Sequence, residues 1–428
     1  MSCRPSTRKG HKAKGTKKRS PFARSMATLI SGSAVAQIIT IVVAPITTRL
    51  FSPEELGVYT LVISSVTMFG AVLSLRYDMS IVYEEDERNV HPLVVLSTRL
   101  CLATSLFVSI GYFFYFAYLS GTGYSAWAAA LFTFIQCALF GLVNVLNAYN
   151  NRKCQYGIMS AANVERTLFQ NLAIVGTGLA HLGATGLIAA QSLGYAFGVK
   201  KQATGLYAER EKLREVRAAD LKRVGRKHKK QALWSAPAAF ANGFAYSVIN
   251  YFIEYLYSAT TVGFYSVSYR VLGLPTNVIA QNISRVFAER AARDKQSDGN
   301  FLRIYKKTLA MMVAMSVPVA IVLVLVAPQL FGFVFGEGWE VAGTYVQILT
   351  PMFVLRFIAG GLNTSAMISG KQHWDLIVQL MLVVSMVGSF FVSLTMGLEI
   401  EGMLELINWV SSAIYVFYIG VFWYCARC

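Results

Sequence analysis

Three arginines lie inside long apolar stretches of this chain, where a positive charge is costly. Arg166, Arg270 and Arg356 each interrupt such a stretch. A charged side chain at the centre of a membrane-spanning helix costs about 2.5–3.5 kcal/mol on insertion scales, so it usually faces a cavity or a partner. Only Glu165 and Glu254 are acids at comparable positions. The excess positive charge predicts an anionic substrate group, and planar guanidinium groups suit the oxygens of a phosphate.

Neutral polar residues recur at helical spacing in the same stretches. Asn242, Tyr246, Asn250 and Glu254 are four residues apart, which places them along one side of a helix. Gln37 belongs to a similar polar stripe in the first apolar stretch. Such residues also serve as hydrogen-bonding contacts between helices, but a shared polar lining is what a cleft between two halves requires. The candidate substrate-binding residues are therefore Arg270, Arg356, Arg166, Asn242, Asn250, Glu254, Gln37 and Asn277.

The stretches that carry these residues are the expected secondary structure elements. The chain has 428 residues, of which 55% are hydrophobic and 14% charged, whereas a soluble domain carries about 25% charged residues. About twelve apolar runs approach the ~20 residues that span a bilayer as a helix. We expect an all-α integral membrane protein with helices over residues 26–47, 56–75, 94–119, 125–148, 157–180, 183–204, 234–257, 262–284, 309–335, 344–368, 376–395 and 402–424.

Lysine and arginine alternate between the connecting loops. Loops 119–124, 180–184, 258–261, 335–341 and 397–401 contain none, and residues 45–55 contain Arg49 alone. The other loops contain nearly all of them, so we expect these loops and both termini to be cytoplasmic. The net charge of +17 is concentrated in tails and loops beside apolar segments, which argues against nucleic-acid binding. The basic residues of tail 1–24 are expected to contact anionic membrane lipids.

The two halves of the sequence are related by a repeat. Residues 50–59 reappear as residues 256–265, with Gly57 and Gly263 in register 206 positions apart. A weaker match relates residues 148–157 to 366–375. Equivalent positions on the same side of the membrane predict a parallel repeat of two six-helix lobes. The expected organisation is a basic tail (1–24), a first lobe (25–205), a basic cytoplasmic linker (206–232), a second lobe (233–424) and a short cytoplasmic tail (425–428).

Enzyme signatures do not stand out in this sequence. It has no phosphate-binding P-loop and no histidine or cysteine pattern typical of a metal site, so we expect neither an enzyme nor a cofactor. Cys425 and Cys428 form a lone C-x-x-C that we attribute to chance.

Three segments resemble the polysaccharide-transporter branch of the multidrug/oligosaccharidyl-lipid/polysaccharide (MOP) exporter superfamily. They are the outer turn at residues 45–59, the sequence Leu75-Arg76-Tyr77-Asp78 after the second helix, and residues 262–265 followed by Tyr269, Arg270 and Pro275. In that branch the acid at position 78 is more often glutamate. The resemblance covers residues 25–424 and leaves out the basic tail.

This resemblance implies a flippase of undecaprenyl-diphosphate-linked oligosaccharides in the bacterial cytoplasmic membrane. It also implies a V-shaped pair of lobes that alternates between inward-open and outward-open states without ATP, with a polysaccharide polymerase and chain-length proteins as partners. A cation-coupled drug exporter of the same superfamily is an alternative, but it would need embedded acids. A non-transporting scaffold of a glycan-assembly complex is another, and a dry, filled cleft would favour it.

Overall fold

Helices form all of the regular structure in the described part of the chain. The computed structural model describes residues 21–371 and 373–427, with side chains from Ser31 onward except at Ala238, Tyr246, Asn277 and Val278. The expected tail 1–24 therefore lies mostly outside the described residues, as does Cys428.

The first lobe contains six long helices and one short one. They are α1 (Pro21–Leu50), α2 (Pro53–Phe69), α3 (Tyr77–Tyr83), α4 (Glu87–Phe114), which continues into the π-helical turn η1 (Tyr115–Leu119), α5 (Ala126–Arg152), α6 (Tyr156–Leu179) and α7 (Gly183–Gln202). The second helix is shorter than expected, because the chain leaves it at Phe69 and turns before α3.

The second lobe repeats this arrangement after a linker. The linker contains α8 (Thr204–Tyr207), α9 (Arg210–Arg214), α10 (Ala218–Lys227) and the π-helical turn η2 (Gln231–Ser235). The lobe itself contains α11 (Ala236–Leu256), α12 (Ala259–Pro275), the π-helical turn η3 (Thr276–Ala280), α13 (Gln281–Asp298), α14 (Leu302–Phe335), α15 (Glu340–Leu362), α16 (Ser365–Ile368), α17 (His373–Met396) and α18 (Ile400–Arg427). The switch to π-helix follows Pro275, which cannot donate a backbone hydrogen bond.

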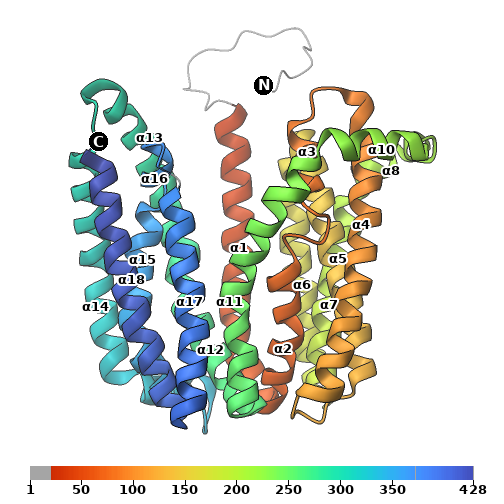
Figure 1. Ribbon diagram of the computed structural model, residues 1–428. Helices are drawn as coiled ribbons and strands as arrows, with labels where there is room; N and C mark the ends of the chain where they lie inside the picture. Colours follow the sequence, from red (N-terminus) through yellow and green to blue (C-terminus); the bar gives the residue numbers. More distant parts are fainter. Residues whose placement is uncertain (1–20, 372, 428) are drawn as a thin grey trace, which may run out of the picture.

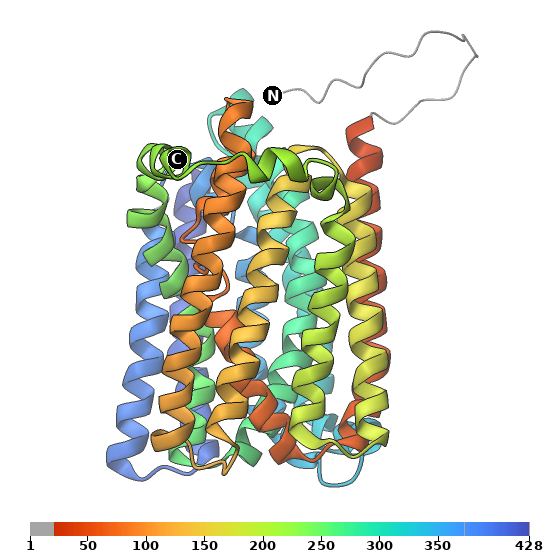
Figure 2. The same ribbon diagram turned by 90° about the vertical axis from the view of Figure 1, so that its right-hand side faces the viewer.

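The predicted all-α membrane fold with two repeated lobes is confirmed. Seven of the described helices are long and apolar enough to cross a membrane; α2, α6, α7, α11 and α12 complete about twelve long helices in the same bundle. Equivalent pairs of helices pack together in both halves. The α4–α5 pair of the first lobe corresponds to α14–α15 of the second, α6–α7 corresponds to α17–α18, and α1–α6 corresponds to α11–α17. Figure 1 shows the two lobes side by side, and Figure 2 shows α1 running along α6.

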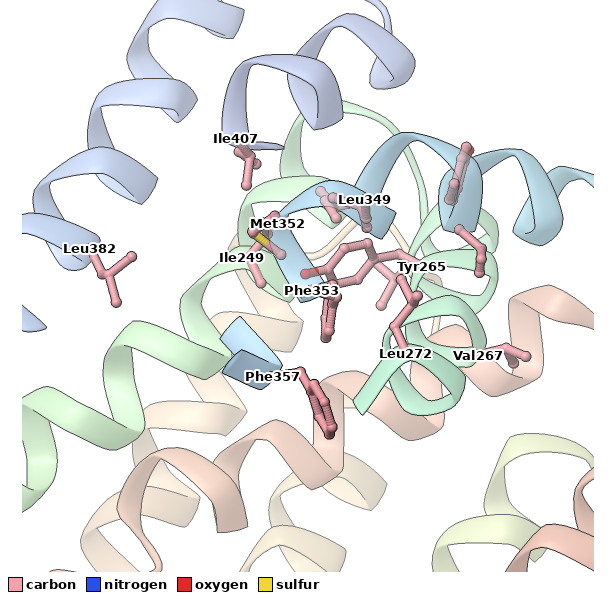
Figure 3. Close-up of a cluster of buried hydrophobic side chains, with 14 of the residues drawn as sticks. Ile249, Tyr265, Val267, Leu272, Leu349, Met352, Phe353, Phe357, Leu382 and Ile407 are labelled. Carbon is pink, nitrogen blue, oxygen red and sulfur yellow. The ribbon is translucent and has the colours of Figure 1, made fainter. Parts of the chain in front are cut away.

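Buried apolar side chains hold each lobe together. In the second lobe, Met352 and Phe353 of α15 lie near Tyr265 of α12 and Ile249 of α11 (Figure 3). This apolar packing excludes water from the interior of the lobe.

The lobes meet closely at the end opposite the termini. A Cβ atom added to Gly57 would lie 1.8 Å from the carbonyl oxygen of Ala259, and one added to Gly263 would lie 1.8 Å from that of Pro53. These four positions are equivalent pairs in the sequence repeat, so the repeat produces a reciprocal crossing of α2 and α12 that only glycine permits. In Figure 1 the lobes converge at this end and diverge toward the termini.

Two further contacts reinforce this closed end. The Glu254 carboxylate of α11 is buried and accepts hydrogen bonds from Tyr115 Oη (2.8 Å), Ser120 Oγ (3.0 Å) and the Gly121 amide (2.8 Å) of the first lobe. At the end of α1, Thr48 Oγ1 donates to the Phe335 carbonyl (2.9 Å), and Trp339 Nε1 donates to the Thr48 carbonyl (3.1 Å).

The basic linker docks on the first lobe at the end that carries the termini. The fully buried Glu84 carboxylate contacts Lys227 Nζ at 2.6 Å and His228 Nε2 at 2.7 Å. Burial alone would raise the pKa of Glu84, but hydrogen bonds from Lys227, the Asp86 amide, His228 and Asn89 outweigh it and lower the pKa to about 2. Between α7 and η2 the linker forms three short helices, α8, α9 and α10.

Candidate functional site

A pocket of about 410 Å³ lies between the lobes and contains two of the predicted arginines. The first lobe contributes residues of α2, and the second lobe contributes residues of α11, α12 and α15. The lining residues are Tyr59, Thr60, Ile63, Ser64, Thr67, Ser247, Asn250, Tyr265, Ser266, Tyr269, Arg270 and Arg356. None of them is acidic, so the described lining carries only positive formal charge.

Arg356 is held in place by aromatic side chains. Its Nη1 donates a hydrogen bond to Tyr269 Oη at 2.6 Å, and its guanidinium carbon lies 5.4 Å from the ring centroids of Tyr269 and Phe353. A guanidinium over aromatic faces is stabilised electrostatically without being neutralised. The Tyr269 hydroxyl and the two rings therefore hold the half-buried Arg356 at the wall of the pocket.

Arg270 is the more open of the two arginines. It precedes Pro275 on α12, its side chain is exposed, and it forms no ion pair with any acid in the described part of the chain. Across the pocket, Asn250 Nδ2 donates to Ser64 Oγ of α2 at 2.8 Å. The pocket thus combines a positive charge free to meet an anion with a hydrogen bond that joins the two lobes.

The other predicted residues lie elsewhere. Arg166 stacks on Tyr195 within the first lobe, 5.2 Å from the ring centroid, and its buried Nε has no hydrogen-bond partner among the described residues. Glu254 belongs to the closed end. Asn242 and Gln37 are not part of the pocket lining, and the side chain of Asn277 lies outside the described residues.

Several pocket residues were missed from the sequence. On α2, Thr60, Ser64 and Thr67 follow a helical period that could have been recognised as a polar stripe facing the cleft. Tyr269 was noticed only as part of the segment that resembles the transporter family, and its contact with Arg356 is what gives it a place in the pocket.

Comparison with solved structures gives the same fold at low sequence identity. A lipid II flippase MurJ in an inward closed conformation is 13% identical with a TM-score of 0.71, covering 90% of this chain and 86% of that one. A multidrug resistance MATE family transporter in an inward-facing conformation is 13% identical with a TM-score of 0.60, covering 92% and 93%. A MOP superfamily transporter from Pyrococcus furiosus, described by a reverse polarity of its binding pocket, is 15% identical with a TM-score of 0.58, covering 93% of each chain.

Sequence comparison identifies the family. None of the curated proteins matches the chain. Residues 46–344, well over half of the chain, match the family described as polysaccharide biosynthesis protein. The solved structures that share the fold are transporters and a flippase rather than enzymes. The chain is therefore a multi-pass membrane protein that belongs to the polysaccharide biosynthesis protein family.

Proposed function

We propose that this protein flips undecaprenyl-diphosphate-linked oligosaccharides across the bacterial cytoplasmic membrane for surface polysaccharide synthesis. The observation that carries this proposal is the pocket between the lobes, where Arg270 and Arg356 stand without an acidic residue in the lining. A diphosphate brings the negative charge and the oxygens that two guanidinium groups can bind through paired hydrogen bonds.

The arrangement of the lobes supports alternating access around this pocket. The pocket draws its lining from both lobes, so a rocking motion of one lobe against the other would change its exposure. The contacts of Gly57, Gly263 and Glu254 hold one end closed. The basic loops lie at the other end, which we propose is cytoplasmic together with both termini.

A cation-coupled drug exporter is less well supported. Such a transporter needs a carboxylate that faces the pocket. Of the two acids predicted within apolar stretches, Glu165 pairs with Lys201 at 2.8 Å, and Glu254 accepts three hydrogen bonds at the closed end; neither lines the pocket. The scaffold hypothesis required a filled cleft, and a cavity of about 410 Å³ argues against it.

The test is complementation of a flippase-null strain. Arg270→Ala and Arg356→Ala should each stop glycan display while the protein stays at its normal level in the membrane. Arg→Lys should restore only part of the display, because an ammonium group lacks the planar fork. Arg303→Ala, on α14 outside the pocket, is the matched control and should display glycan normally. Full display by the double Ala variant would overturn the proposal, and loss of the protein from the membrane would show that these arginines are structural.

A further inference from the structure

A second cavity, of about 610 Å³, lies within the first lobe next to the pocket between the lobes. Its walls come from α2, α3, α5, α6 and α7 and from the turn that follows α2. Ile63 and Thr67 of α2 line both this cavity and the pocket that contains Arg270 and Arg356. A single extended ligand could therefore occupy both spaces across the same stretch of α2.

Carboxamide side chains line one wall of this cavity. Asn144, Asn147 and Asn151 are spaced three and four residues apart on α5, so they share one side of that helix. Asn144 Nδ2 donates to the Gly70 carbonyl at 3.2 Å. The side-chain amides of Asn147 and Asn151 form no hydrogen bond within the described part of the chain, which leaves donors and acceptors of both available to a ligand.

Arg76 also lines this cavity and has an unfavourable backbone conformation. Leu75 and Arg76 have φ angles of 48° and 65°, in the left-handed region that non-glycine residues rarely adopt. This turn places Arg76 at the cavity, where its buried Nε has no hydrogen-bond partner among the described residues. A glycine would adopt this backbone more easily, and an arginine stands here with its side chain lining the cavity.

The remaining polar and aromatic groups distinguish the kind of ligand. The buried Asp78 lines the cavity and accepts a hydrogen bond from Ser74 Oγ at 2.7 Å, so the wall carries a negative as well as a positive side chain. Phe140 and Tyr195 also line it, with ring centroids 5.5 Å apart. The formal charges of Arg76 and Asp78 offset each other, so the lining does not favour a purely anionic ligand. A sugar fits better, because its hydroxyl groups donate and accept hydrogen bonds and its C–H groups suit aromatic faces.

We propose that this amide-lined cavity binds the sugar part of the substrate while the adjacent pocket holds the diphosphate. The inference rests on the proposed function for the position of the diphosphate. Asn147 and Asn151 bind sugar hydroxyls, Arg76 donates to a sugar oxygen, and Phe140 and Tyr195 contact the ring. The volume of the cavity falls in the range of about 300–1,000 Å³ that is typical of small-molecule sites.

The test separates the sugar from the diphosphate with two probes. Farnesyl diphosphate and farnesyl-diphosphate-linked N-acetylglucosamine are titrated by calorimetry against full-length protein in lipid nanodiscs, with empty nanodiscs as the blank. The wild type should bind the sugar-bearing probe on the order of tenfold more tightly, as two added hydrogen bonds provide. We call this gain in affinity of the sugar-bearing probe over farnesyl diphosphate the sugar increment. The Asn147→Leu/Asn151→Leu double variant should lose the sugar increment and bind farnesyl diphosphate as the wild type does.

Two further variants test whether the effect is specific to the residues that line the cavity. Asn163→Leu makes the same chemical change on α6 outside the cavity lining and should keep the increment. Arg76→Gly removes the guanidinium and relieves the left-handed backbone, so it should lose the increment without a lower unfolding temperature.

Different binding results would overturn the sugar site and the proposed function. A sugar increment that is absent in the wild type, or that survives in the double variant, overturns the sugar site. Weaker binding of farnesyl diphosphate by the double variant also overturns it, because the cavity would then be a phosphate site. The proposed function fails separately, if farnesyl diphosphate does not bind or binds equally to Arg270→Ala/Arg356→Ala.

Discussion

At the scale of single residues, identical side chains have different surroundings. Arg166 stacks on Tyr195 inside one lobe, Arg356 is fixed by Tyr269 and Phe353, and Arg270 is exposed in the pocket between the lobes. An arginine in a membrane helix needs a polar or aromatic environment, but many different environments meet that need. Their neighbours therefore decide which arginines can meet a ligand.

The hydrogen bond from Arg356 to Tyr269 gives the first prediction. Tyr269→Phe keeps the ring under the guanidinium and removes only the hydroxyl that accepts the 2.6 Å bond. A hydrogen bond to a charged group contributes about 1.5–3 kcal/mol, so Arg356 should lose its fixed orientation. We expect the rate of glycan appearance at the cell surface to fall on the order of tenfold at unchanged protein level.

Tyr305→Phe is the matched control for this prediction. Its hydroxyl donates to the Ile419 carbonyl at 2.8 Å, and Tyr305 is not part of the pocket lining. Equal rates for Tyr269→Phe and the wild type would mean that the orientation of Arg356 is set by its other contacts.

At the scale of helices, the sequence repeat explains how α2 and α12 cross. Gly57 packs against the backbone at Ala259, and Gly263 packs against the backbone at Pro53. Close helix crossings in membranes rely on small residues in this way. The crossing forms only while the end opposite the termini is closed. These glycines therefore affect the equilibrium between the closed and open states at that end.

Alanine at either glycine should therefore favour opening at that end. The added Cβ would overlap a carbonyl oxygen at 1.8 Å, and such overpacking costs about 1–3 kcal/mol. Spin labels at Glu54→Cys and Thr260→Cys, which are equivalent positions of the repeat, should show longer distances in Gly57→Ala and Gly263→Ala. Gly388→Ala is the control, because a Cβ there would meet nothing within 4 Å. An unchanged distance distribution in both variants would contradict this account.

The docked linker gives a prediction about pH. The Glu84 pKa lies at about 2, below its ordinary value of 4.5. A lowered carboxylate pKa means that its stabilisation is complete above about 4.5 and is lost as the pH falls toward about 2. Glu209, which contacts His91 at 2.6 Å, changes stability in the same direction: burial opposes the shift, but the His91 hydrogen bond and nearby lysines lower its pKa.

Mobility of a spin label at Lys222→Cys on α10 measures this docking. It should stay low from pH 8 to pH 5 and rise as the pH falls below about 4.5. Glu84→Gln should make the label mobile at every pH, because neutral glutamine leaves Lys227 without its 2.6 Å carboxylate partner. Glu85→Gln changes the exposed neighbour and should behave as the wild type. A label that stays as immobile in Glu84→Gln as in the wild type at pH 7 would rule out Glu84 as the main contact.

At the scale of the whole molecule, charge and closure define two different ends. The basic linker and α13 lie at the end with the termini, and the contacts between lobes concentrate at the other. If the basic end is cytoplasmic, this conformation of the protein is closed toward the outside. Orientation and conformational state can therefore be tested together.

Cysteine labelling in intact cells tests the orientation. In a variant without the six native cysteines, Thr260→Cys and Glu337→Cys should react with an impermeant thiol reagent added outside. Glu337 is preferred over its neighbour Gly338, whose φ of 87° would strain a cysteine. Lys212→Cys should react only after the membrane is permeabilised. The reverse pattern would invert the molecule and remove the basis for an outward-closed state.

The sequence by itself determined the properties that depend on local pattern. Hydropathy and spacing predicted the membrane class, about twelve helices and the arginines at costly positions, because each of these follows from the residues of one segment. The repeated lobes followed from matching two segments of the sequence. The domain boundaries and the membrane orientation stay predictions. The second helix was placed too long, since nothing in its composition marked the turn at residues 70–76.

Only the tertiary structure decided which segments share a site. The rotation and crossing of helices depend on close packing, such as that of Gly57 and Gly263, and these determine which faces meet. That packing brings Arg270 and Arg356 into one pocket, leaves Arg166 in another environment and gives Glu254 partners in the opposite lobe. The left-handed turn at Arg76 and its cavity also depend on contacts between helices distant in sequence. A one-dimensional pattern does not contain those contacts, because helical periodicity defines the sides of a helix but not the neighbour that each side faces.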